Sequence, residues 1–286
     1  DLSIDYFERP QPAGPWDWQA VDGKELRGTI DKAVGAKRGE NVVFVVRHRD
    51  RYSKIIDYYS GRKESEKTVA KHYFKQQKGL VGQAFSFDAL HCQPTLLQEI
   101  NKQEGAYLVQ VKGNQPTLQE DLAWLAQASP VQATFHTFNK GHGRLEERKA
   151  WLYEIETACL ETRWHKAHLQ SMIIVERSTE QLKTHHKTQE KAYYISNLAA
   201  TQKNGQELIE AISGHWQVES NNYIRDTSFG EDAIRTKKAG LIRTIAVFLN
   251  LAINQLQKCN QVGNLNITRE NIAYNRKLIY PCFNTG

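Results

Sequence analysis

The stretch FSFDALHC, residues 85–92, poses the question on which the fold and the chemistry depend. Phe85, Ser86 and Phe87 are typical of the end of a buried β-strand. Asp88 follows at the place where the strand should stop. A carboxylate there is a candidate metal ligand if other carboxylates lie beside it, whereas a cap for the next helix is the alternative for Asp88 alone.

The patterns around this stretch predict a mixed α/β fold. Alternating or β-branched runs predict five strands, at 16–22, 40–48, 53–60, 81–88 and 106–112. Helical periodicity that ends at a glycine predicts helices at 64–79 and 95–105. The resulting order, β-β-β-α-β-α-β, indicates a meander followed by two crossover units, and so a mixed five-stranded sheet flanked by helices.

Residues 116–200 have a different pattern. After a helix at 117–127, they contain four extended segments, at 133–140, 144–155, 170–179 and 191–198. A helix is expected from about Gln206, and a last amphipathic helix at about 233–258, with its buried side formed by Ile242, Ile245, Leu249, Ala252, Ile253 and Leu256. The predicted domain organisation is an irregular segment (1–15), a first part of the core (16–115), a β-rich insertion (116–203), the last core helices (204–260) and a C-terminal segment (261–286).

Charge and composition restrict the possible partners. The net charge is +6 and the pI is about 9.0, which suits a polyanion such as nucleic acid but also an ordinary basic soluble protein. No run of 18 apolar residues is present, so no membrane span is predicted. The four cysteines form no C-x-x-C pair, which argues against a zinc site and indicates reduced thiols in a cytoplasmic protein.

A third carboxylate comes from the segment 208–232, read as a helix over its first turns. Ile212, Trp216, Glu219 and Tyr223 would share one face, which puts Glu219 toward the body of the protein. Asp22 ends the first strand as Asp88 ends the fourth, and neighbouring strands lie about 4.8 Å apart. Three such carboxylates can hold two Mg²⁺ or Mn²⁺ ions for in-line attack on a phosphodiester. A salt bridge for Glu219 and a plain turn for Asp22 are the alternatives.

Five segments in order resemble the ISAs1-type insertion-sequence transposases, relatives of the IS4 group and of H-repeat-associated proteins. They are AVDGKELRG (20–28), FDALHCQ (87–93), YLVQVKGNQPTL (107–118), GHGRLEER (141–148) and ISGHWQVESNNYIRDTSFGEDA (212–233). The resemblance implies an RNase H-like core with a DDE triad at Asp22, Asp88 and Glu219, and an inserted β-rich region before the last acid. The Tyr-x2-Arg-x3-Glu-x6-Lys pattern of the IS4 group falls on Ile212, His215, Glu219 and Asp226, so only its glutamate is kept.

Further residues are candidates for DNA contact or for supporting the carboxylates: Lys24, Lys112, Asn114, His142, Arg144, His215, Trp216 and Asp226. Lys112 and Arg144 suit phosphate contacts, and Asn114 suits a base or backbone contact, although each also fits a solvated loop. Trp216 fits either base stacking or the core, and the core is the expectation. Glu231 and Asp232 form a rival pair for the third acid, expected beyond the helix on an exposed end.

The predicted function is that of a DDE transposase, a DNA endonuclease and strand transferase that uses two Mg²⁺ ions, for which Mn²⁺ can substitute. Double-stranded DNA, as transposon ends and target, is the expected partner. The resemblance implies a homodimer on DNA, within a larger complex or alone, in the nucleoid region of a prokaryotic cytoplasm. Two alternatives remain open: a catalytically silent DNA-binding or scaffold protein, and a nuclease subunit that cuts without transposing.

Overall fold

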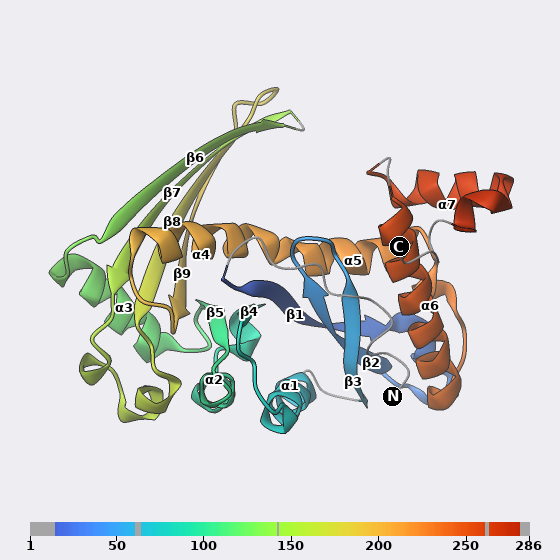
Figure 1. The fold of residues 1–286 in the computed structure, drawn as a ribbon, viewed down its shortest axis with the longest axis horizontal. Coiled ribbons are helices and arrows are strands. Elements are labelled where there is room, and N and C mark those ends of the chain that lie inside the picture. The colour runs from blue at the N-terminus through green and yellow to red at the C-terminus, as the bar shows by residue number, and fades with distance from the viewer. Residues whose placement is uncertain (1–14, 61–63, 142, 261–262, 281–286) are drawn as a thin grey trace. The chain divides into compact units, whose positions relative to one another are not determined.

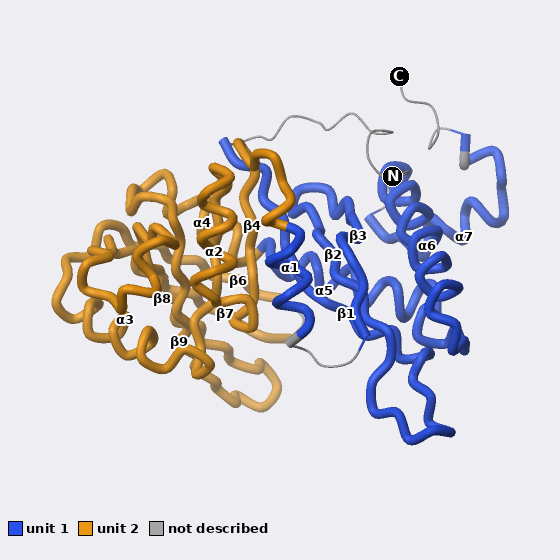
Figure 2. Tube along the Cα trace, turned by 90° about the horizontal axis from the view of Figure 1, so that it is seen from below, with its two compact units in different colours: residues 1–73, 214–286 blue, residues 74–213 orange. Residues whose placement is uncertain are grey.

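The computed structural model describes residues 15–60, 64–141, 143–260 and 263–280. The chain forms two compact units, which Figure 2 colours separately. The first unit contains residues 1–73 and 214–286, and the second contains residues 74–213. Of the expected terminal segments, 1–15 lies outside the described residues except for residue 15, whereas residues 263–280 of the segment 261–286 are described. The predicted division into core and insertion remains a prediction.

The first unit is built on an antiparallel meander of three strands, β1 (Asp17–Leu26), β2 (Glu40–Arg47) and β3 (Ser53–Ser60). The second and third strands have the bounds expected from their β-branched and aromatic residues. The first strand is longer than predicted, because pairing with β2 continues through Asp22 to Leu26. Asp22 therefore lies inside a strand, opposite Phe44, and does not end it.

Helices α5 (Trp216–Thr227) and α6 (Ala239–Cys259) pack on this meander, α5 on β1 and β2, and α6 on β3. The same unit contains α7 (Leu265–Tyr274) and most of α1 (Glu64–Gln76). The shared core consists of alternate residues of the strands together with apolar residues of both helices: Ala20, Leu26, Val42, Phe44, Val46, Val218, Ile242 and Ala246. Because strand side chains alternate between faces, Asp22 and Lys24 belong to the same face of β1 as Ala20 and Leu26.

The buried stripe of α6 differs from the prediction. Ile242 and Ile253 are buried as expected, but Ala252 is exposed, and Ile245, Leu249 and Leu256 are only half-buried. The remaining buried positions include two asparagines, Asn250 and Asn254, whose side-chain amides both donate to the Ser53 carbonyl. Their burial depends on that partner almost 200 residues away, which hydrophobic periodicity does not reveal.

Within the described part of the chain, α6 is the one helix long and apolar enough to cross a membrane by length and composition. A core helix can meet the same criterion, and α6 contributes Ile242 and Ala246 to the core.

Cys92 and Cys159 are free thiols, whereas Cys259 is disulfide-bonded, so the expectation of reduced thiols is wrong for Cys259. Sequence spacing does not show which sulfur atoms a fold brings together.

The second unit contains a six-stranded mixed sheet. Its strands are β4 (Gln83–Phe87), β5 (Ala106–Val111), β6 (Ala133–Gly141), β7 (Arg144–Glu154), β8 (Ser171–Gln181) and β9 (Lys187–Ser196). β4 and β5 are parallel, as a crossover through α2 (Pro94–Lys102) requires, and β5 pairs antiparallel with β9. The order then continues β9-β8-β7-β6, all antiparallel.

All four extended segments predicted at 133–198 are strands, and β6 to β9 run side by side as long hairpins (Figure 1). They share one sheet with β4 and β5, because β9 pairs with β5. Pairing at this edge satisfies backbone groups of β5 that would otherwise lack partners. Helices α3 (Pro116–Ala128) and α4 (Gln202–Gly214) complete the unit, and α4 begins four residues before the predicted start.

Candidate functional site

Asp22 projects from the face of β1 on which α5 packs. Its side chain is half-buried, and Asn222 of α5 approaches it, with Nδ2 3.5 Å from Asp22 Oδ2. Two residues further along β1, Lys24 Nζ lies 2.7 Å from Oδ1 of Asp226. These two contacts connect the strand that carries Asp22 to the helix that carries Glu219.

The two contacts match in spacing. Two strand residues, Asp22 to Lys24, advance about 6.6 Å, and four helical residues, Asn222 to Asp226, advance about 6 Å. The helix therefore runs along β1 in the same direction, with residues 219, 222 and 226 on one side, since positions three and seven apart share a helix face. Glu219 lies about one turn before Asn222 on the same side of α5.

Glu219 is nevertheless on the open side of α5, contrary to the expectation that its face is covered. Trp216 is 51% exposed and Tyr223 is 68% exposed, whereas the buried stripe consists of Val218, Asn221 and Arg225. The expectation that Trp216 belongs to the core is therefore wrong. The helix predicted to be continuous from residue 208 is interrupted at His215, between α4 and α5, so the periodicity does not carry across. Partial burial still raises the pKa of Glu219 above its usual value.

Lys24 is almost fully buried, and its ammonium is surrounded by carboxylates. Its Nζ atom contacts two acids in addition to Asp226. It lies 3.0 Å from Asp232 Oδ1 and 3.4 Å from Glu231 Oε2. Burial by itself would lower the pKa of Lys24, but the hydrogen bonds to Asp226 and Asp232 and the charge of Glu231 outweigh it, and the pKa is raised. Lys24 is thus a buried positive charge whose ammonium pairs with Asp226, Glu231 and Asp232.

The rival acids Glu231 and Asp232 belong to this network and are not a separate exposed pair. Glu231 is buried and accepts from Arg225 at 2.9 and 2.5 Å, and Arg225 is itself fully buried and donates to Asn250 Oδ1 at 3.1 Å. The guanidinium lies over the ring of Phe44, 4.5 Å from its centroid. Glu231 is thus occupied in a structural ion pair, which is the reason the expected exposure is wrong.

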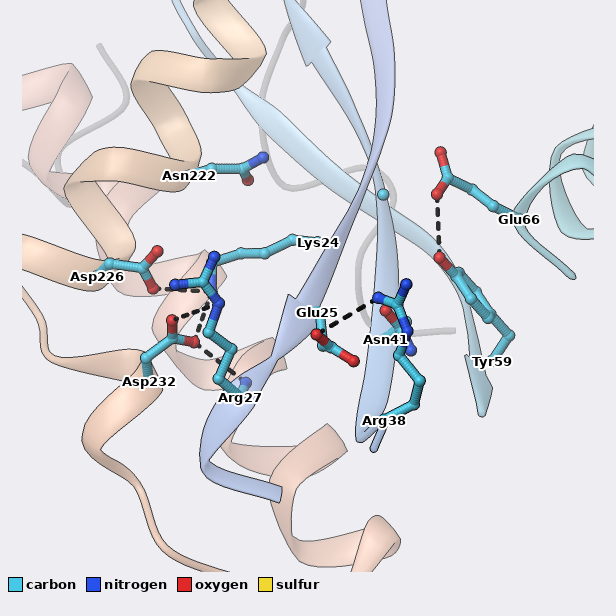
Figure 3. Close-up of a pocket in the computed structure, with 11 residues that line it drawn as sticks. Lys24, Glu25, Arg27, Arg38, Asn41, Tyr59, Glu66, Asn222, Asp226 and Asp232 are labelled. Carbon is cyan, nitrogen blue, oxygen red and sulfur yellow. Dashed lines mark hydrogen bonds and ion pairs between the residues drawn. The ribbon is translucent and has the colours of Figure 1, made fainter. Parts of the chain in front are cut away.

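Beside this network lies a cavity of about 310 Å³ (Figure 3). It is lined by charged and polar side chains, among them Lys24, Asn222, Asp226, Asp232, Arg27 and Arg38. On another part of its wall, Glu66 accepts a hydrogen bond from the Tyr59 hydroxyl, 3.0 Å away. A β-carbon in place of Gly23 would lie 2.3 Å from Oε2 of Glu66, so a side chain there requires the Glu66 carboxylate to move.

The end of α4, just before α5 begins, is in close contact with His48. A β-carbon added at Gly214 would lie 2.2 Å from the His48 ring, so only glycine leaves room for the imidazole. Burial, and then the nearby His215, lower the pKa of His48 to about 3, so it is neutral in the folded protein. His215 comes directly before α5, one turn ahead of Glu219.

In the second unit, Asp88 follows β4 as predicted and caps the short helix η3 (Ala89–His91), which was the alternative role considered for it. Its Oδ1 accepts from the Leu90 N–H and contacts His91 Nδ1, both at 3.0 Å. The loop after β5 meets this turn, because Asn114 Nδ2 donates to the Ala89 carbonyl at 2.6 Å. Parallel strands end at one sheet edge, and Asp88 shares that edge with Asn114 and the exposed Lys112.

The carboxylates of the predicted triad divide between the units, with Asp22 and Glu219 in the first and Asp88 in the second. Among the described residues, no group of three His, Cys, Asp or Glu side chains is placed to hold a metal ion. Arg144 is exposed at a hairpin end, and His142 lies outside the described residues. Sequence reasoning missed Asn222, whose position three residues after Glu219 was a usable signal, and Arg225, whose burial had none.

The chain is similar to several bacterial proteins. A family model described as Transposase DDE domain matches residues 19–255. YbfL of Escherichia coli (strain K12) is 25% identical over 244 residues, which cover 83% of this chain and 63% of YbfL. YncI of E. coli O157:H7, provisionally named a transposase, is 25% identical over 272 residues, 90% of this chain and 66% of YncI. The H repeat-associated YhhI of E. coli K12, also provisionally named a transposase, is 24% identical over 244 residues, 83% of this chain and 63% of YhhI. The chain thus spans 63 to 66% of the length of these relatives.

Proposed function

The chain belongs to the transposase DDE domain family, and on that premise we propose that it cuts DNA phosphodiester bonds and joins the ends to target DNA. The finer assignment to the ISAs1 branch of the IS4 group belongs to this proposal. So do action on transposon ends as a homodimer and a cytoplasmic location on the nucleoid.

The catalytic residues of the proposal are Asp22, Asp88 and Glu219. The observation that carries it is the matched spacing of β1 and α5, which sets Glu219 one helical turn from the Asn222–Asp22 contact. The two acids, from segments almost 200 residues apart, thus belong to a strand and a helix that pack together. Support for Asp88 comes from its place at the end of β4 and from family membership.

Membership of a DDE family implies dependence on a divalent metal ion. The donors that the triad offers are carboxylate oxygens, the ligands that Mg²⁺ and Mn²⁺ prefer. Two such ions would activate the attacking hydroxyl or water and neutralise the departing oxygen. Asn222 would hold the Asp22 carboxylate in orientation, and the capping contacts of Leu90 and His91 would do the same for Asp88.

Other residues would serve the DNA. Lys112 is exposed at the same sheet edge as Asp88 and is proposed to contact phosphate. Asn114 is proposed to hold the Asp88 turn through its bond to Ala89. Trp216 and His215, at the start of α5, are proposed to face the DNA near Glu219, where an exposed indole can stack on a base.

The test is a cleavage assay on supercoiled and linear duplex DNA with Mg²⁺ or Mn²⁺. Wild type is compared with Asp22→Asn, Asp88→Asn and Glu219→Gln, and DNA binding is followed by fluorescence anisotropy in EDTA. Loss of an orienting partner costs 10- to 100-fold at a metal site, so loss of a ligand should cost more than about 100-fold in rate. The matched controls are Asp121→Asn on α3 and Glu210→Gln on α4, which should cut normally.

Metal-dependent cutting that disappears in all three variants, with binding retained, would support the proposal. Strand-transfer products would distinguish a transposase from a nuclease that only cuts. Binding without cutting by the wild type would favour a catalytically silent protein, and equal cutting by all variants would contradict the assigned triad.

A further inference from the structure

The two hairpins of the β6–β9 sheet end next to each other in the second unit (Figure 1). We define the arm tip as the described residues among 140–144 and 181–187. Arg144 of β7 pairs with Gln181 of β8, and the Leu182 N–H donates to the Gly143 carbonyl at 2.9 Å. This bond ties the two turns together, so side chains from both hairpins project from one edge of the sheet.

The arm tip is strongly basic. Its cations are Lys140, Arg144, Lys183 and Lys187, with His185 and His186 beside them. The adjacent acid is Glu180, which contacts His185 Nδ1 at 3.1 Å and Lys187 Nζ at 3.2 Å, and these contacts lower its pKa. Within the described part of the chain, Lys140, Arg144 and Lys183 form no ion pair.

The strands below the arm tip have a different arrangement of charge. There basic residues pair with acids, along β7 in Lys149–Glu147 and between β8 and β9 in Arg177–Glu190 and Lys191–Glu176. Paired charges stabilise neighbouring strands and leave little net field. The excess of positive charge therefore lies at the arm tip. Its cations Lys140, Arg144 and Lys183 are not needed for ion pairs that hold the strands together.

Shape and polarity favour a nucleic acid over a protein partner. Residues 181–187 are all exposed, and Leu182 is the large apolar side chain that the described part of the arm tip exposes. A protein-binding surface would be expected to present aromatic or aliphatic anchors. Cations on a hairpin instead suit the phosphates along a DNA groove, which admits a two-stranded β-ribbon.

We infer that the arm tip binds the phosphate backbone of duplex DNA through Lys140, Arg144 and Lys183, with both hairpins contributing. The inference rests on the proposed function for its ligand, but it concerns a surface separate from the carboxylates. Contacts to phosphates carry no base sequence, so the binding is expected to be independent of DNA sequence.

The experiment measures the affinity for a duplex of arbitrary sequence by fluorescence anisotropy, in EDTA, over a series of salt concentrations. Each neutralised phosphate contributes about 0.9 to the slope of log K against log salt concentration. The triple variant Lys140→Gln, Arg144→Gln, Lys183→Gln should therefore reduce the magnitude of that slope by about 2.7. Lys183→Gln alone should reduce it by about 0.9 and tests the second hairpin.

The matched control is the triple variant Lys149→Gln, Arg177→Gln, Lys191→Gln, which removes the same charge from the same sheet below the arm tip. Its slope should stay within about 0.5 of the wild-type value, since long-range charge alone releases few counterions. Equal slopes for the two triple variants, at equal unfolding midpoints, would overturn the inference. So would a wild-type protein that does not bind the duplex, whereas loss of cutting with unchanged binding slopes would bear only on the triad.

Discussion

The ammonium of Lys24 lies 2.7 Å from the carboxylate of Asp226, and this ion pair fixes α5 on β1 beside Asp22. Lys24 is two residues from Asp22 on the same strand face, and Asp226 is seven residues from Glu219 on the same helix side. A shift of one turn along α5 would separate this pair and move Glu219 by about 5.4 Å. The pair thus contributes to the register between β1 and α5, the strand and helix that carry two of the proposed catalytic acids.

Replacing Lys24 with Met should destabilise the protein by about 3 kcal/mol, because Asp226, Glu231 and Asp232 then lose their common cation. The expected loss of unfolding free energy is at the low end for a buried ion pair, because the Asp226 side chain is 34% exposed and water screens its charge. Urea unfolding followed by circular dichroism measures the change.

Lys102→Met is the control for that substitution. Lys102 pairs with Glu99 on the surface of α2, where an ion pair contributes less than about 1 kcal/mol. If both lysine variants lose the same free energy of unfolding, the buried network does not hold α5 in place.

An alanine at Gly214 should cost about 1 to 3 kcal/mol, because its β-carbon requires the half-buried His48 ring to move. The thermal midpoint should fall accordingly. In a His48→Ala background the same alanine should cost much less, since the obstructing ring is gone. A double-mutant cycle on Gly214 and His48 measures this coupling.

Gly240→Ala is the matched control, because no atom lies within 4 Å of an added β-carbon in the first turn of α6. Alanine there should be neutral or slightly stabilising, by up to about 1 kcal/mol. An equal change in stability at both glycines would contradict contact with His48 as the cause of the loss at Gly214.

Stability should fall between pH 7 and pH 5 through His48. Its pKa is lowered from 6.5 to about 3 in the folded protein, first by burial and then by His215, so only the unfolded state takes up a proton in that range. The contribution of the neutral ring is full above the unfolded pKa of 6.5 and is lost as pH falls toward about 3. Each pH unit in that window costs about 1.4 kcal/mol, so the loss from pH 7 to pH 5 is about 2 kcal/mol.

His48→Gln removes the titration while keeping a polar side chain of similar length. Urea unfolding of both proteins at pH 5 and pH 7 isolates the effect of His48 from that of the other histidines. A variant that loses as much stability as the wild type on acidification would contradict a neutral His48 imidazole in the folded protein.

Local patterns identified most of the secondary structure. The runs at 40–48 and 53–60 are β2 and β3, and the four segments of the predicted β-rich region are β6 to β9. Such patterns succeed because β-branched and alternating residues act through near neighbours and through one buried face. The alternation around Asp22 gave the correct strand but the wrong end, because pairing with β2 determines where β1 stops.

The buried face of α5 was not predictable in the same way. Hydrophobic periodicity pointed to Trp216 and Tyr223, whereas the structure buries Asn221 and Arg225. Arg225 can be buried because Glu231, Asn250 and the Phe44 ring meet it, and they come from three other segments. A polar side chain is buried only where its partners are supplied.

The sequence by itself therefore determined the order and type of the helices and strands, the basic character of the chain and its likeness to DDE transposases. These properties depend on local periodicity, composition and short motifs. The tertiary structure decided which face of α5 is open, that Lys24 is directed at acids, and that two hairpin turns form one basic tip. Those features depend on hydrogen bonds and charges between residues far apart in the chain, and such partners meet only after folding.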